Sequence, residues 1–511
     1  MSKGLVWSLL ATFVGAVGTL LVTPILVRAL GAAEFGVYLL VIAVASYSSF
    51  FDFGFAWVAT RYFAQDLASG DKQDLCRRFR TVETLFWIIG LACALTGVLI
   101  AAPLGRAAKA DQSQIMVALL VSAFSFALTL QGQLHASLLR AAQRFTPAGA
   151  ISALGNFLLP VFSYAGVKYH PSLLLLLWAN AGVNVISLAV YTWVNRLQLK
   201  GGPLWCFNAK YLRQMAHFGG WSTVSKLVQM VVLQVDRLAV ALVGTVSGLT
   251  YYAVPANLAS KVNLLGSPSA SLFFARSSAL FAAGDRAEVS VQLARNVRLL
   301  LWSAVALSAP LVALGPTFLR VWIGPEMQAN GGRVLIVFAV AYALISVSGI
   351  YSVTIDAAGH YQWNAISILA WSFPAIGIAI LGLPYLGFTA IAVGAASWMI
   401  GVSLTCIVMA RVLGFSSQTR SWLGAFAAGG AVVMAGRIIT PYPGNPLAVL
   451  GCMSILGVLS LGLGWLTVLR SPDRAELQVL FSRGLADLQR TRHKIQSPRS
   501  THIPIAVKRS E

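Results

Sequence analysis

Apolar runs of about twenty residues recur along almost the whole of this chain, separated by short stretches that hold most of its Arg, Lys and turn residues. A helix of that length crosses the hydrocarbon core of a bilayer. An open sheet cannot satisfy its backbone in lipid, and the runs are too long and too uniformly apolar for barrel strands. The composition agrees, because 58% hydrophobic and 10% charged residues leave too little polar surface for a water-soluble protein.

The sequence therefore predicts an all-α, polytopic membrane protein of about fourteen transmembrane helices. We place the first twelve spans at residues 5–29, 35–60, 83–105, 113–138, 147–168, 172–194, 216–243, 249–275, 298–322, 333–358, 363–383 and 388–410. The last two are residues 422–439 and 447–469. The first run is longer than the apolar part of a cleavable signal, so we interpret it as a span.

The basic residues indicate the orientation of the chain. With the amino terminus in the cytoplasm, about 27 Lys and Arg residues fall in connections on the inner side and about 7 on the outer side. This asymmetry predicts two cytoplasmic termini and an even number of helices, which twelve spans would also satisfy. It also accounts for the net charge of +21 without a nucleic-acid partner.

An internal repeat appears at an interval of about 213 to 216 residues. Leu30-Gly31 returns as Val243-Gly244, and Arg140 to Phe145 returns as Asp356 to Tyr361. The interval covers six spans, so both copies point the same way, which predicts two six-helix lobes related by a pseudo-twofold axis along the membrane normal. The expected division is an N-terminal lobe at 1–194, a C-terminal lobe at 195–411, two extra helices at 412–469 and a basic cytoplasmic tail at 470–511.

Charged and amide side chains gather on one face of the seventh span, residues 216–243. Lys226, Gln229 and Arg237 lie there at helical spacing. A charge inside a span needs a partner, a water-filled cavity or a position near a helix end.

The eighth span adds Lys261, one turn after Asn257 and too central to reach the interface. The three basic residues of these two spans face one acid, Asp236, so we predict a cationic, amide-lined cavity for an anionic solute. The alternative is a set of internal ion pairs, in which Asp236 neutralises Arg237 or Lys261 and no solute binds.

The amino-terminal half contributes Asp52 in the second span, with Arg61 at its inner end. Asp52 either pairs with a cation or serves as a protonatable coupling site. Asn180 and Asn184 form part of a polar stripe on the sixth span, which either lines the solute path or makes interhelical hydrogen bonds.

Several other polar features have a simpler expected explanation. Solvation near span ends is expected for Arg28, Glu34, His135, Arg140, His217 and Asp356. The five cysteines have no paired spacing, so neither disulfides nor a metal site are indicated. No phosphate-binding, zinc-protease or nucleophile-elbow motif occurs, so we expect neither an enzyme nor a cofactor. The tail either lies on the anionic inner leaflet or is solvated.

Two ordered sets of residues carry a family resemblance. They are Pro24, Arg28-Ala29-Leu30-Gly31, Glu34-Phe35-Gly36-Val37-Tyr38, Asp52-Phe53-Gly54 and Arg61, followed by Gln234-Val235-Asp236-Arg237, Gly244 and Tyr251-Tyr252-Ala253-Val254. In this order the chain, to about residue 470, resembles the polysaccharide transporter family, the Wzx-type flippases of the multidrug/oligosaccharidyl-lipid/polysaccharide exporter superfamily.

The resemblance implies a bacterial inner-membrane flippase that moves an undecaprenyl-pyrophosphate-linked oligosaccharide by alternating access, for O-antigen or exopolysaccharide synthesis. Its expected partners are the polyprenyl-linked oligosaccharide, membrane lipids, a polysaccharide polymerase and a chain-length regulator. In this interpretation Lys226, Arg237 and Lys261 hold the anionic head group. The alternatives are a multidrug antiporter of the same superfamily and a membrane-embedded polymerase or ligase.

Overall fold

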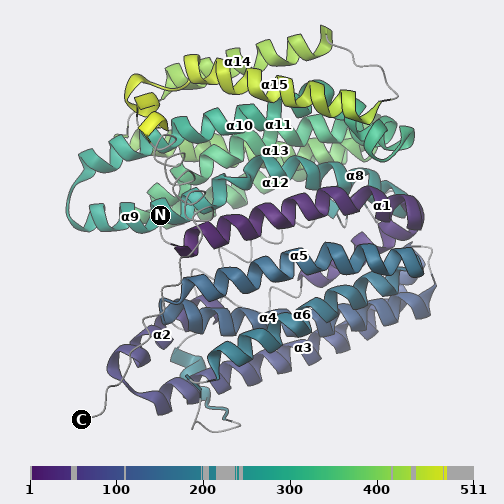
Figure 1. The fold of residues 1–511 in the computed structure, drawn as a ribbon, viewed down its shortest axis with the longest axis vertical. Helices are drawn as coiled ribbons and strands as arrows, with labels where there is room; N and C mark the ends of the chain where they lie inside the picture. The colour runs from purple at the N-terminus through teal and green to yellow at the C-terminus, as the bar shows by residue number, and fades with distance from the viewer. Residues whose placement is uncertain are drawn as a thin grey trace, which may run out of the picture.

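The computed structural model describes residues 3–47, 55–108, 111–196, 198–199, 206–214, 236–237, 239–240, 245–415, 418–438, 445–475 and 477–479. The helices bounded in this part of the chain begin with α1 Lys3–Tyr47, α2 Phe55–Ser69, α3 Lys72–Ala108, α4 Gln112–Ala141, α5 Phe145–Tyr169 and α6 Leu173–Asn195 (Figure 1). They continue with α8 Val246–Ala259, the 3₁₀ helix η2 Ser260–Leu264, α9 Gly266–Ala282, α10 Arg286–Trp322, α11 Pro325–Ala357, α12 Tyr361–Leu386, α13 Thr389–Val412, α14 Thr419–Ile438 and α15 Pro446–Thr467.

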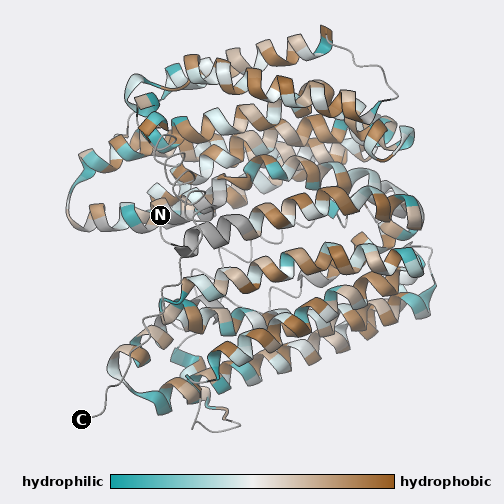
Figure 2. Ribbon diagram, in the orientation of Figure 1, coloured by the Kyte–Doolittle hydropathy of each residue, from teal (hydrophilic) through white to brown (hydrophobic). Residues whose placement is uncertain are grey.

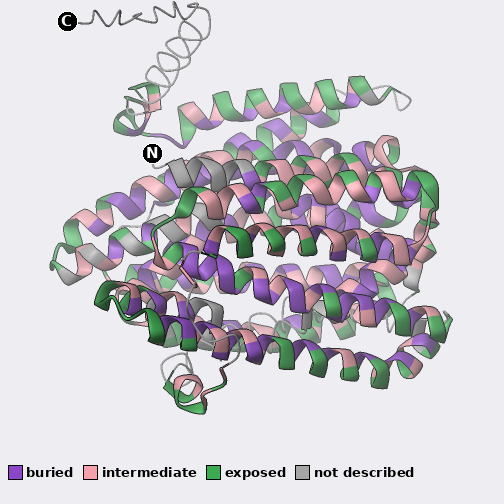
Figure 3. Ribbon diagram, turned by 60° about the horizontal axis from the view of Figure 1, so that its bottom comes forward, coloured by how far each residue is buried: buried purple, intermediate pink, exposed green. Residues whose placement is uncertain are grey.

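The predicted all-helical membrane fold is confirmed. Among the described residues, 11 helices are long and apolar enough to cross a membrane. The total of fourteen stays a prediction, because most of the expected span at 216–243 lies outside the described residues. Many large hydrophobic residues of the helices are exposed, as expected of surfaces that contact lipid. The ribbons coloured by hydropathy and by burial show how such residues are distributed along the helices (Figures 2 and 3).

The first two predicted spans meet at Gly31 inside α1. Gly31 has φ 77° and ψ 163°, whereas the residues on either side of it are helical. This region of backbone space is adopted almost solely by glycine, because a Cβ atom would clash with its own peptide groups. No atom of a neighbouring residue lies within 4 Å of the position that a Cβ of Gly31 would take. The glycine is therefore required by the backbone conformation and not by packing.

We expect Gly31→Ala to lower the free energy of unfolding by about 1–3 kcal/mol, because alanine must adopt this strained conformation. The matched control is Gly182→Ala in α6, where the added methyl group also meets no neighbouring atom. Thermal unfolding of the purified protein in detergent measures both variants. Equal midpoints for the two variants would contradict the role given to Gly31.

The eighth predicted span, residues 249–275, is not one continuous helix. The structure breaks it into α8, η2 and α9. Pro268 lies in the first turn of α9, where its missing N–H costs no hydrogen bond, and therefore favours a new helix start. Gly266 permits close packing on α11, because an added Cβ would lie 3.0 Å from the Ser346 carbonyl oxygen.

The helices form two bundles, which we call the first bundle (residues 3–195) and the second bundle (residues 246–467) (Figure 1). Among the described helices, the main packing between the bundles is that of α1 against α8. One hydrophobic core includes Leu26, Phe35 and Leu173 of the first bundle together with Leu249 and much of the second bundle. These first-bundle residues lie toward the end that the charge distribution places outside.

The opposite, predicted inner half of the first bundle has its own core. Phe63, Phe79, Leu134 and Leu138 belong to a separate cluster that contains no residue of the second bundle. Among the described residues, the two bundles are therefore joined through the halves that the charge distribution predicts to lie outside. The predicted pseudo-twofold relation between them remains a prediction.

A buried ion pair ties the last two helices of the second bundle to α10. The Arg298 guanidinium on α10 donates from Nε to Asp473 Oδ2 (2.5 Å) and from Nη2 to Asp473 Oδ1 (2.8 Å). Arg298 also donates to the side-chain oxygen of Gln418 at 3.0 Å. Asp473 follows α15 and Gln418 precedes α14, so one guanidinium fixes the ends of both helices that the charge distribution predicts to lie inside.

Asp473→Ala should leave the Arg298 charge buried without its partner and destabilise this attachment by about 3 kcal/mol. Hydrogen exchange over residues 446–475 should become faster. The double substitution Arg298→Met with Asp473→Leu removes both charges and should recover much of the protection. Unchanged exchange in the single variant would show that the ion pair does not hold α14 and α15.

Candidate functional site

A contact between the bundles lies at the predicted outer end. Arg28 on α1 donates from Nε to the Ile323 carbonyl oxygen (3.2 Å) and from Nη2 to the carbonyl oxygens of Trp322 (2.9 Å) and Val321 (3.3 Å). These acceptors lie at the carboxyl end of α10, where the helix dipole favours a cation. The sequence suggested solvation for Arg28, and the residue is indeed exposed, but the hydrogen bonds of its guanidinium to the second bundle were not predicted.

Two further hydrogen bonds support the same junction. Trp322 Nε1 donates to the Leu20 carbonyl oxygen at 3.1 Å, and Thr250 Oγ1 on α8 donates to the Ala32 carbonyl oxygen at 2.7 Å. Each bond joins a side chain of the second bundle to the backbone of the first. Together with the shared hydrophobic core, they form what we call the outer closure.

Arg28→Gln should weaken the outer closure and raise the population of conformers whose outer ends are apart, by about fivefold for an exposed, charged donor. Distances between spin labels at Gln112 and Ala329, exposed positions near the outer ends of the two bundles, would report the change. The control is Arg106→Gln, because among the described residues the guanidinium of Arg106 donates only within its own helix. Identical distance distributions for the two variants would rule out the assigned role.

The predicted cationic site is partly described. Asp236 accepts hydrogen bonds from the Tyr252 hydroxyl (2.6 Å, at Oδ2) and from the Arg237 backbone N–H (2.8 Å, at Oδ1). The Arg237 guanidinium instead donates to Asn257 Oδ1 at 2.9 Å. Asn257 lies on α8, so this bond joins the predicted seventh and eighth spans. The geometry brings Arg237 and Asn257 together, and the amide-lined cationic cavity itself remains a prediction.

Lys261 lies in η2, at the break between α8 and α9. Its side chain is half-buried and forms no hydrogen bond or ion pair with the part of the chain that the structure describes. Within the same part of the chain, no salt bridge joins Asp236 to Lys261 or to Arg237. The positive surplus of this region is therefore not removed by direct pairing among these three residues.

The asparagines of the sixth span make interhelical hydrogen bonds. The side-chain nitrogens of Asn180 (3.2 Å) and Asn184 (2.8 Å) both donate to Ser125 Oγ on α4. Asn184 also donates to the Ser125 carbonyl oxygen at 3.3 Å. Both side chains are only half-buried, so their carbonyl oxygens remain the groups that a solute hydroxyl could approach.

Four other candidate side chains are not placed by the structure. Lys226, Gln229 and Asp52 lie outside the described residues. Arg61 lies in α2, but its side chain is not described. Their assignments remain predictions.

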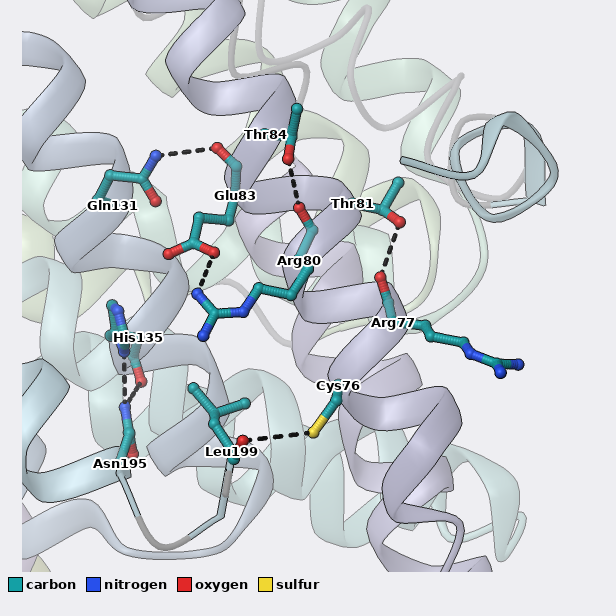
Figure 4. Close-up of polar contacts among 10 residues, drawn as sticks. All are labelled: Cys76, Arg77, Arg80, Thr81, Glu83, Thr84, Gln131, His135, Asn195 and Leu199. Atoms are coloured by element: carbon teal, nitrogen blue, oxygen red, sulfur yellow. Dashed lines mark hydrogen bonds and ion pairs between the residues drawn. The ribbon is translucent and has the colours of Figure 1, made fainter. Parts of the chain in front are cut away.

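A polar cluster at the predicted inner end of the first bundle joins α3, α4 and α6 (Figure 4). Arg80 pairs with Glu83 at 2.6 Å, and the side-chain nitrogen of Gln131 donates to the Glu83 carbonyl oxygen at 3.0 Å. Asn195 donates to the His135 carbonyl oxygen at 3.0 Å. His135 is 3% exposed and packs edge-on against an aromatic ring, so the solvation expected for it is wrong.

The family of the chain follows from its similarity to known proteins. Residues 25–327, more than half of the chain, match the family model described as "Polysaccharide biosynthesis protein". The chain belongs to this polysaccharide biosynthesis family. The resemblance found in the sequence is thereby confirmed.

A relative of this polysaccharide biosynthesis protein is a Shigella flexneri protein assigned as an O-antigen transporter. The two are 23% identical over 421 residues, which cover 80% of this chain and 96% of the relative. Among solved structures, the lipid II flippase MurJ in an inward closed conformation is 15% identical, with a TM-score of 0.67 over 90% of this chain and 99% of that one. An inward-facing multidrug MATE transporter is 14% identical, with a TM-score of 0.63 over 83% and 96% of the two chains. At these identities the structures show a shared fold.

The sequence did not predict several side-chain contacts that tertiary packing creates in this member of the family. Tyr252 is fully buried, and its hydroxyl binds Asp236. Glu34 was expected to be solvated, but its Oε1 accepts the Leu173 backbone N–H at 2.8 Å, at the amino end of α6. The Tyr251-Tyr252 pair in the family signature was the available signal for the first of these contacts.

Proposed function

We propose that this protein is a flippase that moves a polyprenyl-pyrophosphate-linked oligosaccharide across the bacterial inner membrane by alternating access. Membership of the polysaccharide biosynthesis family and similarity to an O-antigen transporter support this substrate class. The chain is a multi-span membrane protein, and both termini are proposed to lie in the cytoplasm. A polysaccharide polymerase and a chain-length regulator are proposed partners.

The observation that carries the proposal is the cation in the broken helix, Lys261, for which the described residues supply no hydrogen-bond or ion-pair partner. Membrane transporters place irregular backbone where it is buried in protein or lines a water-filled path, and they bind solutes at such breaks. Lys261 lies at the break. Asn257, whose side-chain oxygen accepts a hydrogen bond from the Arg237 guanidinium, lies just before the break on α8. A pyrophosphate would offset this positive charge, while the polyprenyl chain remains in lipid.

The remaining candidate residues would act around Lys261 and Arg237. Lys226 would add a third cation for the head group, and Gln229 and Asn257 would contribute amides. Asn180 and Asn184 would contact sugar through their carbonyl oxygens, since their amide nitrogens already bind Ser125. Asp52 or Asp236 would balance charge or couple transport to protons, with Arg61 near Asp52 at the inner end of its span.

The outer closure supports alternating access. The bundles share a hydrophobic core and three sets of hydrogen bonds in their outer halves, whereas the inner half of the first bundle has a separate core. A solute could therefore enter from the cytoplasmic side in this conformation. The opposite conformation would require the outer closure to separate.

A multidrug antiporter shares the fold but requires a different site. Organic cations favour an acid-rich, aromatic pocket, whereas the region around Lys261 has a positive surplus. Sensitivity of a deletion strain to cationic drugs, with normal surface glycan, would favour the antiporter over the flippase.

Lys261→Gln and Arg237→Gln should each reduce glycan export by about tenfold, because a charged hydrogen-bond donor to phosphate is worth about 1.5–3 kcal/mol. Lys261→Arg should keep most of the activity. Export is measured as surface glycan in a strain that depends on this gene, at matched protein levels. The control is Arg286→Gln, which removes an exposed positive charge at the predicted inner end of α10. Normal export in both site variants would remove these residues from the mechanism.

A further inference from the structure

A separate hollow lies at the inner ends of α14 and α15, outside the proposed transport site. Its volume is about 530 Å³. We call it the arginine notch, and its lining residues include three arginines, Arg420, Arg470 and Arg474. Among the described residues, no Asp or Glu lines it. The charge distribution of the chain places this end of the two helices at the cytoplasmic face of the membrane.

Close helix packing and the buried ion pair shape the arginine notch. Thr467 Oγ1 donates to the Gly424 carbonyl oxygen at 3.1 Å, where α14 and α15 approach closely. The Arg470 backbone N–H donates to Asp473 Oδ2 at 3.0 Å, and Asp473 is held in turn by Arg298. The chain segment that carries two of the three arginines is therefore fixed to the second bundle.

The arginine notch keeps its positive charge. Burial alone would raise the pKa of Asp473, but the hydrogen bonds from Arg298 and from the Arg470 backbone outweigh it and leave the pKa below its usual value. The nearby carboxylate is thus ionised and already neutralised by Arg298. In the described part of the chain, no Asp or Glu forms a salt bridge with the guanidinium of Arg420, Arg470 or Arg474.

The backbone adds to this positive potential. Arg420 and Ser421, in the first turn of α14, line the arginine notch, so the positive end of that helix dipole lies beside it. Arg474 donates from Nη2 to the Leu466 carbonyl oxygen at 2.8 Å, but its Nε is buried and has no partner within the described residues. The lining therefore has an unsatisfied donor as well as excess charge.

The surroundings of the arginine notch are apolar and face lipid. Leu466, which lines it, is 66% exposed, and Leu423 and Phe426 on α14 are 65% and 64% exposed. A free phosphate ion would use only the cationic part of this surface. A phospholipid would place its phosphate on the arginines and its acyl chains along the exposed apolar residues.

We propose that the arginine notch binds the phosphate group of an anionic phospholipid of the cytoplasmic leaflet. The ligand chemistry is a phosphodiester attached to apolar chains, held by Arg420, Arg470 and Arg474. This site is separate from the proposed transport site and does not depend on the identity of the transported glycan.

The test compares lipid binding by the full chain in detergent, using native mass spectrometry with phosphatidylglycerol and with phosphatidylcholine. The variant is Arg420→Gln with Arg470→Gln, because neither guanidinium has a hydrogen-bond partner within the described residues. The matched control is Arg77→Gln with Arg286→Gln, which removes two exposed charges at the same end of the molecule. Equilibrium dialysis with radiolabelled inorganic phosphate tests the free ion.

The parent protein and the control should bind phosphatidylglycerol at least fivefold more tightly than phosphatidylcholine, and the notch variant should lose this preference. The single variants Arg420→Gln and Arg470→Gln should each lose part of it. Equal preference in the notch variant and the control would overturn the proposal. Saturable binding of inorganic phosphate at micromolar concentration, lost in the notch variant, would also overturn it, because the site would then serve a soluble anion.

Discussion

Backbone hydrogen bonding in lipid is the constraint on which this structure depends. No water is present in the hydrocarbon core to satisfy an exposed N–H or C=O, so a spanning segment must be helical wherever it contacts lipid. The break between α8 and α9 obeys this rule, because η2 packs against α11 and its Val262 is 2% exposed. A cation at that break is thereby held at a fixed position by surrounding protein. Irregular backbone and the candidate side chain Lys261 coincide there, and both need the same shielding.

The architecture of the spans was largely predictable from the sequence. The expected spans at 113–138, 147–168 and 172–194 match α4, α5 and α6 within three residues at each end. Hydropathy measures whether a segment prefers lipid, but it does not distinguish one helix from two collinear pieces. The apolar residues on both sides of Lys261 made residues 249–275 resemble a single span and hid the 3₁₀ segment, although Gly266 and Pro268 marked it.

The candidate site was predictable only as a set of residue types. An isolated basic residue in an apolar run indicates function, and this reasoning found Arg237 and Lys261. The partners of these residues depend on tertiary packing, as the Arg237–Asn257 bond illustrates. His135 shows the same limit, since a position near the end of a span gave no sign that neighbouring helices would bury it. Helical periodicity gives the face of a helix, but it does not give the neighbour against that face.

The hydrogen bonds of Arg28 constrain the residue type of the donor but not the residue types of the acceptors. Its guanidinium binds backbone carbonyl oxygens at positions 321 to 323, and every residue type supplies such an oxygen. Exchange of the side chains at 321 and 323 in homologues would therefore keep the acceptors, whereas the donor depends on a single side chain. Covariation between the two partners would be weak even though they touch, so this contact would escape detection by methods that infer proximity from paired substitutions.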